Sequence, residues 1–196
     1  MKRTTLPVLA AIVATCLVAL LAWQNRDLRR TQGELETRVR EPYPGMFVPQ
    51  VATLAIDGAP LDVGAPAADF QVLYFFMPDC PYCAASAASI RALSERLARE
   101  TGGRVPLIGV GNAAVDELLG YVRDQRFGFP IASITEQRTL ALFRASIVPL
   151  VLVVDRNGRV HHATVGTFDS EAKIDLVLAA VRGRTLSSGI DSHDRS

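Results

Sequence analysis

The sequence predicts an α/β domain in which helices flank a central β-sheet, and two observations carry that prediction. First, short apolar runs alternate along the chain with segments whose apolar residues recur at helical spacing. Second, the runs at 72–76, 107–110 and 150–154 are apolar throughout, which is typical of strands covered on both faces. A composition of 49% hydrophobic and 21% charged residues excludes a wholly disordered chain or a collagen-like repeat.

The first half of the domain is expected to contain a hairpin, a strand and a long helix. Asp57-Gly58 supplies a tight turn between the stretches 51–56 and 61–63, which predicts an early β-hairpin. The buried strand at 72–76 leads into an Ala-rich segment that we expect to be helical, with one apolar side formed by Ile90, Leu93 and Leu97.

The second half repeats the alternation of strands and helices. After the strand at 107–110, apolar residues recur at positions i, i+3, i+4 and i+7 and predict a helix: Val115, Leu118, Leu119 and Val122. Leu140 and Phe143 mark a shorter helix. The strand at 150–154 turns through residues 155–158 (DRNG) into the stretch 160–165. A last amphipathic helix carries Ile174, Val177, Leu178 and Val181.

Four segments are expected along the chain. Residues 1–23 form a membrane anchor, an uncleaved signal-anchor, because the run from Leu6 to Trp23 carries no charge and spans roughly 27 Å as a helix, close to a bilayer's hydrocarbon core. The alternative is a cleaved signal peptide, but no A-x-A site precedes Gln24. A charged juxtamembrane helix and a Pro-rich linker then occupy 24–46, the folded domain 47–184, and a disordered tail 185–196.

Charge is distributed unevenly between these segments. Residues 1–41 hold 7 basic and 4 acidic side chains, whereas residues 42–196 hold 14 and 16. A domain with a small negative net charge has no electrostatic reason to bind nucleic acid, so no nucleic-acid partner is expected. Arginines follow the apolar run closely, and the positive-inside rule taken alone would place the domain in the cytoplasm.

The candidate catalytic residues are Cys80 and Cys83, at the junction of a buried strand and a helix. Cys80 falls at the N-cap position, and Pro81 at the first helical position loses only an N–H that would have no partner. The N–H groups of Tyr82 and Cys83 can then point at the Cys80 sulfur, and the positive end of the helix dipole favours thiolate over thiol. Thiolate is the attacking species in disulfide exchange, so Cys80 is the expected nucleophile and Cys83 the resolving thiol.

Other uses of the cysteine pair fit less well. A purely structural disulfide closing so short a loop would contribute roughly 2 kcal/mol, against about 3 for a fifteen-residue loop. A zinc site needs four ligands, and the histidines of the domain, His161 and His162, are neighbours on a strand and so face opposite sides. No metal and no separate cofactor are therefore expected, because a redox-active disulfide between Cys80 and Cys83 carries the electrons itself.

The order of these motifs resembles the thioredoxin superfamily, and more narrowly its membrane-anchored branch of TlpA/ResA-type and cytochrome-maturation thioredoxins. The matching stretches are residues 51–63 (VATLAIDGAPLDV), 71–83 (QVLYFFMPDCPYC), 129–160 (FPIASITEQRTLALFRASIVPLVLVVDRNGRV) and the final helix, and together they cover about residues 48–182. The resemblance implies a thioredoxin-like fold, with a mixed central sheet flanked by helices and an N-terminal β-hairpin, preceded here by the transmembrane helix.

The resemblance also implies a substrate-binding position. Pro149 would be a cis-proline facing the cysteine pair, and the backbone of Val148 would hydrogen-bond an extended substrate segment, a form of strand addition. Tyr82 is expected to be exposed beside the thiol, where it can touch substrate.

Three positions depart from the family pattern. Asp79 abuts Cys80 in place of the usual Trp, and its negative charge disfavours the thiolate that the helix start favours. Tyr74 stands where thioredoxins carry a buried acid, six residues before the first cysteine. Ser86 is not the Glu that some members carry three residues after the second cysteine. Proton transfer to the resolving thiol is then expected to rely on water.

The expected function is that of a membrane-anchored thiol–disulfide oxidoreductase. Its partners would be a protein thiol or disulfide substrate, the inner membrane through residues 6–23, and a membrane protein that donates or accepts electrons. The resemblance implies a reductant that serves cytochrome c maturation or a similar pathway. It also implies that the domain faces the bacterial periplasm, because the family is exported and a cytosolic thioredoxin gains little from an anchor.

Two other classes of function stay open on the sequence alone. A copper-handling module would use both cysteines and His161 or His162, although three residues would be expected between its cysteines, and here there are two. A peroxidase of the peroxiredoxin type shares the overall fold, but it needs an activating Thr and Arg, and no P-x-x-x-T-x-x-C run occurs.

Overall fold

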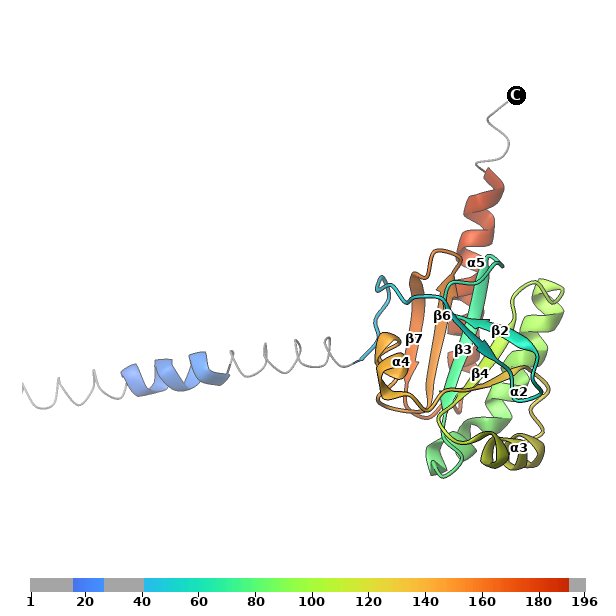
Figure 1. Cartoon of the computed structure of the whole chain (residues 1–196). Helices are drawn as coiled ribbons and strands as arrows, with labels where there is room; N and C mark the ends of the chain where they lie inside the picture. Colours follow the sequence, from blue (N-terminus) through green and yellow to red (C-terminus); the bar gives the residue numbers. More distant parts are fainter. Residues whose placement is uncertain (1–15, 27–40, 191–196) are drawn as a thin grey trace, which may run out of the picture. The chain divides into compact units, whose positions relative to one another are not determined.

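A five-stranded mixed sheet organises the residues that the computed structural model describes, which are 16–26 and 41–190. Its order is β5-β4-β3-β6-β7, and Figure 1 shows β4, β3, β6 and β7 side by side. The strands are β3 (Phe70–Phe76), β4 (Leu107–Gly111), β5 (Ile131–Ser133), β6 (Leu150–Asp155) and β7 (Val160–Val165). The first three are parallel to one another, while β6 pairs antiparallel with β3 and β7 antiparallel with β6.

The central strands are buried along their whole length, as their apolar runs predict. All residues of β3, β4 and β6 are buried. The three-residue strand β5 is absent from the sequence analysis, because so short a run carries no periodic signal. The strand is held in place by its parallel pairing with β4, in which Gly109 lies opposite Ile131.

The predicted hairpin forms from β1 (Val51–Leu54) and β2 (Pro60–Val63), which pair antiparallel across the turn at Gly58. Gly58 has a φ of +86°, a conformation that suits glycine and matches the tight-turn prediction. The hairpin is fixed to the edge of the main sheet, because the Ile56 N–H donates to the Ile131 carbonyl at 2.8 Å.

Helices cover both faces of the sheet. One buried cluster joins one face of β3 to α2 (Pro81–Thr101), α3 (Val115–Asp124) and α5 (Glu171–Ile190), and a second joins the opposite face to α4 (Gln137–Leu142) and the hairpin. Helix α2 buries the predicted Ile90, Leu93 and Leu97, and α5 buries its four predicted apolar residues. This burial is favourable by roughly 1.5–3 kcal/mol for each large aliphatic side chain.

The predicted apolar face of α3 is wrong in part. Leu118 is fully buried, but Val115 is 41% exposed and Leu119 is 43% exposed. Tyr121, three residues after Leu118, packs inward instead. Helical spacing identifies an apolar face of α3, but it does not determine how the helix is rotated about its axis when it packs on the sheet.

Two segment boundaries differ from the sequence analysis. Residues 42–46 of the predicted linker pack on the domain: Pro42 and Met46 are buried, and the Gly45 N–H donates to the Val160 carbonyl at 2.7 Å. At the other end α5 continues to Ile190, so its last turns enter the segment 185–196 that the sequence assigns to an irregular tail. Extending an existing helix adds one hydrogen bond per residue without a new nucleus, which favours such continuation.

The predicted membrane anchor falls mostly outside the described residues. Of the run 6–23, only residues 16–23 are described, and residues 16–26 are helical. Within the described ranges, no helix has the length and apolar character needed to cross a bilayer. The proposed anchor therefore stays a prediction from sequence.

Candidate active site

The cysteine pair lies where β3 ends and α2 begins. Cys80 is the N-cap residue of α2, with extended backbone angles (φ −87°, ψ 112°), and Pro81 occupies the first turn. The Cys83 N–H donates to the Cys80 sulfur at 3.3 Å. The first turn of α2 holds no acidic side chain, and this end of the helix carries the positive end of its dipole. The predicted capping geometry is confirmed, including one of the two expected N–H contacts.

The two thiols differ in access to solvent. Cys80 keeps 8% of its surface exposed, whereas Cys83 has none. Both residues are buried, and Cys80 is the less enclosed of the two. Burial, followed by the hydrogen bond with Cys80, raises the pKa of the Cys83 thiol well above its ordinary value. A slightly exposed cysteine in front of a fully enclosed one is compatible with the roles predicted for an attacking and a resolving cysteine.

The segment before β6 closes one side of the pair. The Val148–Pro149 peptide bond is cis, as the resemblance implies. The Cys80 thiol points at the Val148 carbonyl, with a sulfur–oxygen distance of 3.9 Å. Val148 is half-buried and Pro149 is buried, so the backbone of this segment forms a wall beside the accessible sulfur.

Three exposed side chains are close in the chain to Cys80 or to Val148. Tyr82 is 64% exposed, as predicted. Asp79 is exposed next to Cys80 in the chain. Ile147 precedes Val148 and is 47% exposed, a feature that the sequence analysis missed. The sequence shows an apolar residue directly before Val148-Pro149, but an apolar residue at that position is equally compatible with the buried core.

Polar groups behind the pair differ from those of the resembling family. Tyr74 is fully buried, and its hydroxyl donates to the Cys83 carbonyl at 3.3 Å. Burial and the nearby Cys83 raise the Tyr74 pKa far above its usual value, so its phenol stays neutral. The Ser86 hydroxyl donates to the Tyr82 carbonyl at 2.7 Å and accepts from the Phe168 N–H at 2.8 Å. Neither residue supplies a carboxylate to the thiols.

The two strand histidines lie at the other end of the sheet. His161 contacts the Asp155 carboxylate at 2.9 Å and packs edge-on against Phe70, at the beginning of β3, whereas the cysteines follow the end of that strand. His162 contacts the Thr164 hydroxyl at 2.7 Å. Both histidines are half-buried. Within residues 16–26 and 41–190, no three His, Cys, Asp or Glu side chains are placed to share a metal ion.

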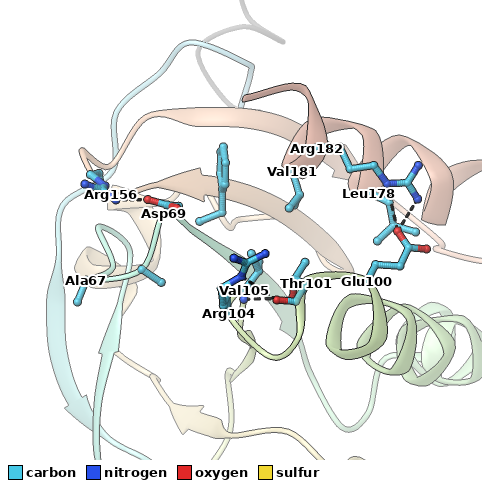
Figure 2. A pocket seen from close by; sticks show the side chains of 12 residues that line it. Ala67, Asp69, Glu100, Thr101, Arg104, Val105, Arg156, Leu178, Val181 and Arg182 are labelled. Atoms are coloured by element: carbon cyan, nitrogen blue, oxygen red, sulfur yellow. Dashed lines mark hydrogen bonds and ion pairs between the residues drawn. The ribbon is translucent and has the colours of Figure 1, made fainter. Parts of the chain in front are cut away.

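A separate cavity of about 550 Å³ lies between the end of α2 and α5, shown in Figure 2. Its apolar lining includes Phe70, at the beginning of β3, so it sits at the opposite end of that strand from the dithiol. Two of its rim arginines are already paired, Arg156 with Asp69 and Arg182 with Glu100. The cavity is therefore distinct from the cysteine pair.

The chain was compared with known proteins on both sequence and structure. No family model and no curated protein matches it. Solved structures do match. The thioredoxin domain of a thiol-disulfide oxidoreductase from Bacteroides vulgatus is 11% identical, with a TM-score of 0.58 over 70% of this chain and 96% of that chain. A secreted disulfide oxidoreductase of Mycobacterium tuberculosis, homologous to E. coli DsbE, is 18% identical, with a TM-score of 0.54 over 68% and 96%.

The fold is thioredoxin-like.

A peroxidoxin is also among the solved structures that match. The peroxidoxin BcpB from Mycobacterium tuberculosis is 20% identical, with a TM-score of 0.59 over 71% of this chain and 96% of that chain. At these identities the likeness establishes the fold and not the reaction, so the choice of chemistry depends on the groups around the cysteines.

The arrangement can carry out reversible dithiol chemistry. An accessible sulfur at a helix N-terminus can attack a disulfide, and a second sulfur one turn away can displace the product. The Cys80 sulfur accepts from the Cys83 N–H, lies 3.9 Å from the Val148 carbonyl and contacts the Cys83 thiol. None of these groups is a charged side chain.

Proposed function

We propose that this chain is a thiol–disulfide oxidoreductase that exchanges disulfides with a protein substrate through Cys80 and Cys83. The observation that carries the proposal is the asymmetric pair at the start of α2: both cysteines are buried, but Cys80 at the N-cap keeps 8% of its surface exposed, whereas Cys83 one turn behind it has none. A structural disulfide would not need the accessible member, whereas exchange with another protein does.

The reaction proceeds in two displacements. The Cys80 thiolate attacks one sulfur of a substrate disulfide, the substrate S–S bond breaks, and the displaced substrate sulfur leaves as a thiolate that takes up a proton. Cys83, after losing its proton to water, attacks the Cys80 sulfur and releases the second substrate thiol. The substrate gains two electrons and the Cys80–Cys83 pair becomes a disulfide, which needs no separate cofactor.

The backbone at Val148 supports a role in holding the substrate. An extended substrate segment beside Val148 would place its disulfide at the Cys80 sulfur, because that sulfur lies 3.9 Å from the Val148 carbonyl. The exposed side chains of Tyr82 and Ile147 would contact the substrate on either side. Substituting Ile147→Asp should therefore weaken exchange with an apolar peptide disulfide more than exchange with a small soluble one.

Trapping the intermediate tests the proposal. In the full chain with Cys16→Ser, the further variant Cys83→Ser should accumulate a mixed disulfide with a peptide that contains one internal disulfide, seen as the peptide's added mass on Cys80. The matched variant Cys80→Ser should trap far less, because Cys83 has no exposed surface. Equal trapping by both variants, or by neither, would contradict the assignment of roles.

We further propose that the pair acts as a reductant, in cytochrome c maturation or a similar pathway, and that a membrane protein supplies its electrons. Equilibration with glutathione buffers measures the direction. A reductant should have a potential at or below about −200 mV, whereas an oxidant of the DsbA type lies near about −120 mV. A value near the latter would reverse the proposed direction of electron flow.

The proposed location is the bacterial inner membrane, crossed once by residues 6–23, with the redox domain in the periplasm. The apolar run and its flanking residues support this proposal. A phosphatase that is active only after export, fused after residue 196, should be active in cells. An inactive fusion that is nevertheless expressed at full length would place the domain on the cytoplasmic side.

Peroxide reduction is the second candidate function, favoured by the likeness to a peroxidoxin. It would require a Thr and an Arg to activate Cys80, and the described polar contacts of that sulfur are with Cys83 and Val148 instead. The copper-handling alternative is weaker, because both strand histidines lie away from the cysteines. Peroxide consumption by the Cys83→Ser variant would favour the peroxidase reading over disulfide exchange.

A further inference from the structure

Two tyrosines from two different elements belong to the same buried cluster as the cysteine pair. Tyr74 lies on β3 and its hydroxyl donates to the Cys83 carbonyl at 3.3 Å. Tyr121 lies on α3 and is only 9% exposed. Its hydroxyl oxygen is fully buried and makes no hydrogen bond with any residue that the structure describes. An unpartnered buried hydroxyl is unfavourable, and it can gain a hydrogen bond when a charge forms beside it.

Aromatic stacking fixes the positions of both phenols. The Phe76 ring stacks on Tyr74 at 5.2 Å and on Tyr121 at 5.4 Å between ring centroids, with interplanar angles of 12° and 22°. All three rings belong to the same buried cluster as Cys80 and Cys83. The two hydroxyls are therefore held by packing on the side of the sheet that also holds the thiols.

The step in which Cys83 attacks Cys80 would be helped by hydrogen-bond donors near the Cys83 sulfur. Cys83 must become a thiolate to attack, yet burial disfavours that charge and raises the pKa of the thiol. The side chains that act on it are Cys80, at the start of the same helix, and Tyr74, on β3. Tyr121, on α3, belongs to the same buried cluster, and both cysteines contribute to the raised pKa of its phenol. Asp79, at the start of α2, is exposed. No carboxylate or cation among the described residues contributes to the raised pKa of Cys83.

We propose that Tyr74 and Tyr121 are neutral hydrogen-bond donors that stabilise the Cys83 thiolate while the mixed disulfide is resolved. This inference rests on the proposed disulfide exchange. The Cys83 proton passes to water, the Cys83 sulfur forms a bond to the Cys80 sulfur, and the bond from Cys80 to the substrate breaks. The substrate sulfur leaves with that electron pair and takes up a proton.

The phenols donate without ionising. Burial, and then the neighbouring cysteines, raise the pKa of both tyrosines far above neutral pH, so neither can act as an ionised base. A neutral phenol that donates to a thiolate forms a charge-assisted hydrogen bond, the stronger kind. In the resembling family a buried acid serves this step. Here the two tyrosines would stabilise the Cys83 thiolate by donating hydrogen bonds, and they would not remove its proton.

The variants Tyr74→Phe and Tyr121→Phe remove the donors and keep the stacked rings. The probe is the full chain with Cys16→Ser, loaded at Cys80 with the chromogenic thiol of Ellman's reagent, and the measurement is the rate at which Cys83 releases that thiol as pH rises. Each variant should release it about tenfold or more slowly at neutral pH, and the rise in rate should move to higher pH. Tyr43→Phe, at an exposed tyrosine in the linker region, is the matched control and should release at the wild-type rate.

The outcomes separate this inference from the proposed function. Failure of Cys80 to accept the probe in the Cys16→Ser protein would remove the proposed exchange itself. Normal loading, with release unchanged in both Phe variants or slowed equally at all pH values, would overturn only the role of the tyrosines. A direct titration of the Cys83 thiolate by ultraviolet absorbance in a Cys80→Ser variant gives a second readout, and Tyr74→Phe should raise that pKa. Circular dichroism of each variant confirms that it folds.

Discussion

Replacing Ser86 by Ala should destabilise the domain through a single lost hydrogen bond. Ser86 is fully buried on α2, and its hydroxyl joins that helix to the loop before α5 by accepting the Phe168 N–H at 2.8 Å. Phe168 is also fully buried, so its N–H would have no water to replace the lost partner. The bond to the Tyr82 carbonyl matters less, because that carbonyl lies within the helix and keeps its backbone partner.

The expected magnitude follows from two opposing effects. Leaving a buried donor unsatisfied costs about 1–3 kcal/mol. Alanine is a better helix former than serine, which returns roughly 0.5 kcal/mol. The free energy of unfolding should therefore fall by about 0.5–2.5 kcal/mol.

Urea unfolding of the reduced full-length protein, followed by far-ultraviolet circular dichroism, measures this change while the redox state is constant. Ser94→Ala on the same helix is the control, because Ser94 is only half-buried and gains the same helix propensity. If Ser86→Ala is as stable as Ser94→Ala, the bond to Phe168 contributes nothing and the reasoning from burial is wrong.

Three further predictions concern stability. Gly158→Ala should destabilise the domain by at least about 1–2 kcal/mol, because Gly158 has a φ of +78° and an added Cβ would lie 2.2 Å from the Val48 carbonyl oxygen. Gly120→Ala, in open space on α3, should instead stabilise the domain by up to about 1 kcal/mol in the same urea assay. Burial lowers the pKa of His162, so the unfolded chain binds a proton at higher pH than the folded one, and stability should fall as pH drops below about 6.5. The unfolding midpoint of His162→Gln should depend less steeply on pH than that of the wild-type protein. An identical pH dependence would exclude His162 as its source. Phe143→Ala, at a fully buried ring that packs against Phe75 at a tilt of 45°, should cost about 3–5 kcal/mol, and a loss below about 1 kcal/mol in thermal unfolding would mean that the core closes around the gap.

Local patterns in the sequence determined the elements and the reactive pair. The apolar runs of β3, β4 and β6, the Asp57-Gly58 turn and the helix start at Cys80-Pro81 each depend on near neighbours in the chain, and each is confirmed. Periodicity and capping are local effects, so a single sequence contains them.

Tertiary packing decided what distant segments contribute. The short strand β5 exists because β4 pairs with it, and the inward face of α3 is set by the ring of Tyr121 rather than by its aliphatic pattern. Burial of Cys83 behind a slightly exposed Cys80 likewise depends on β3, α3 and the segment at Val148, which lie far apart in sequence. The sequence alone places two sulfurs one helical turn apart, but only the packed molecule determines which of them meets solvent and which polar groups surround the other, because desolvation depends on every segment that covers an atom.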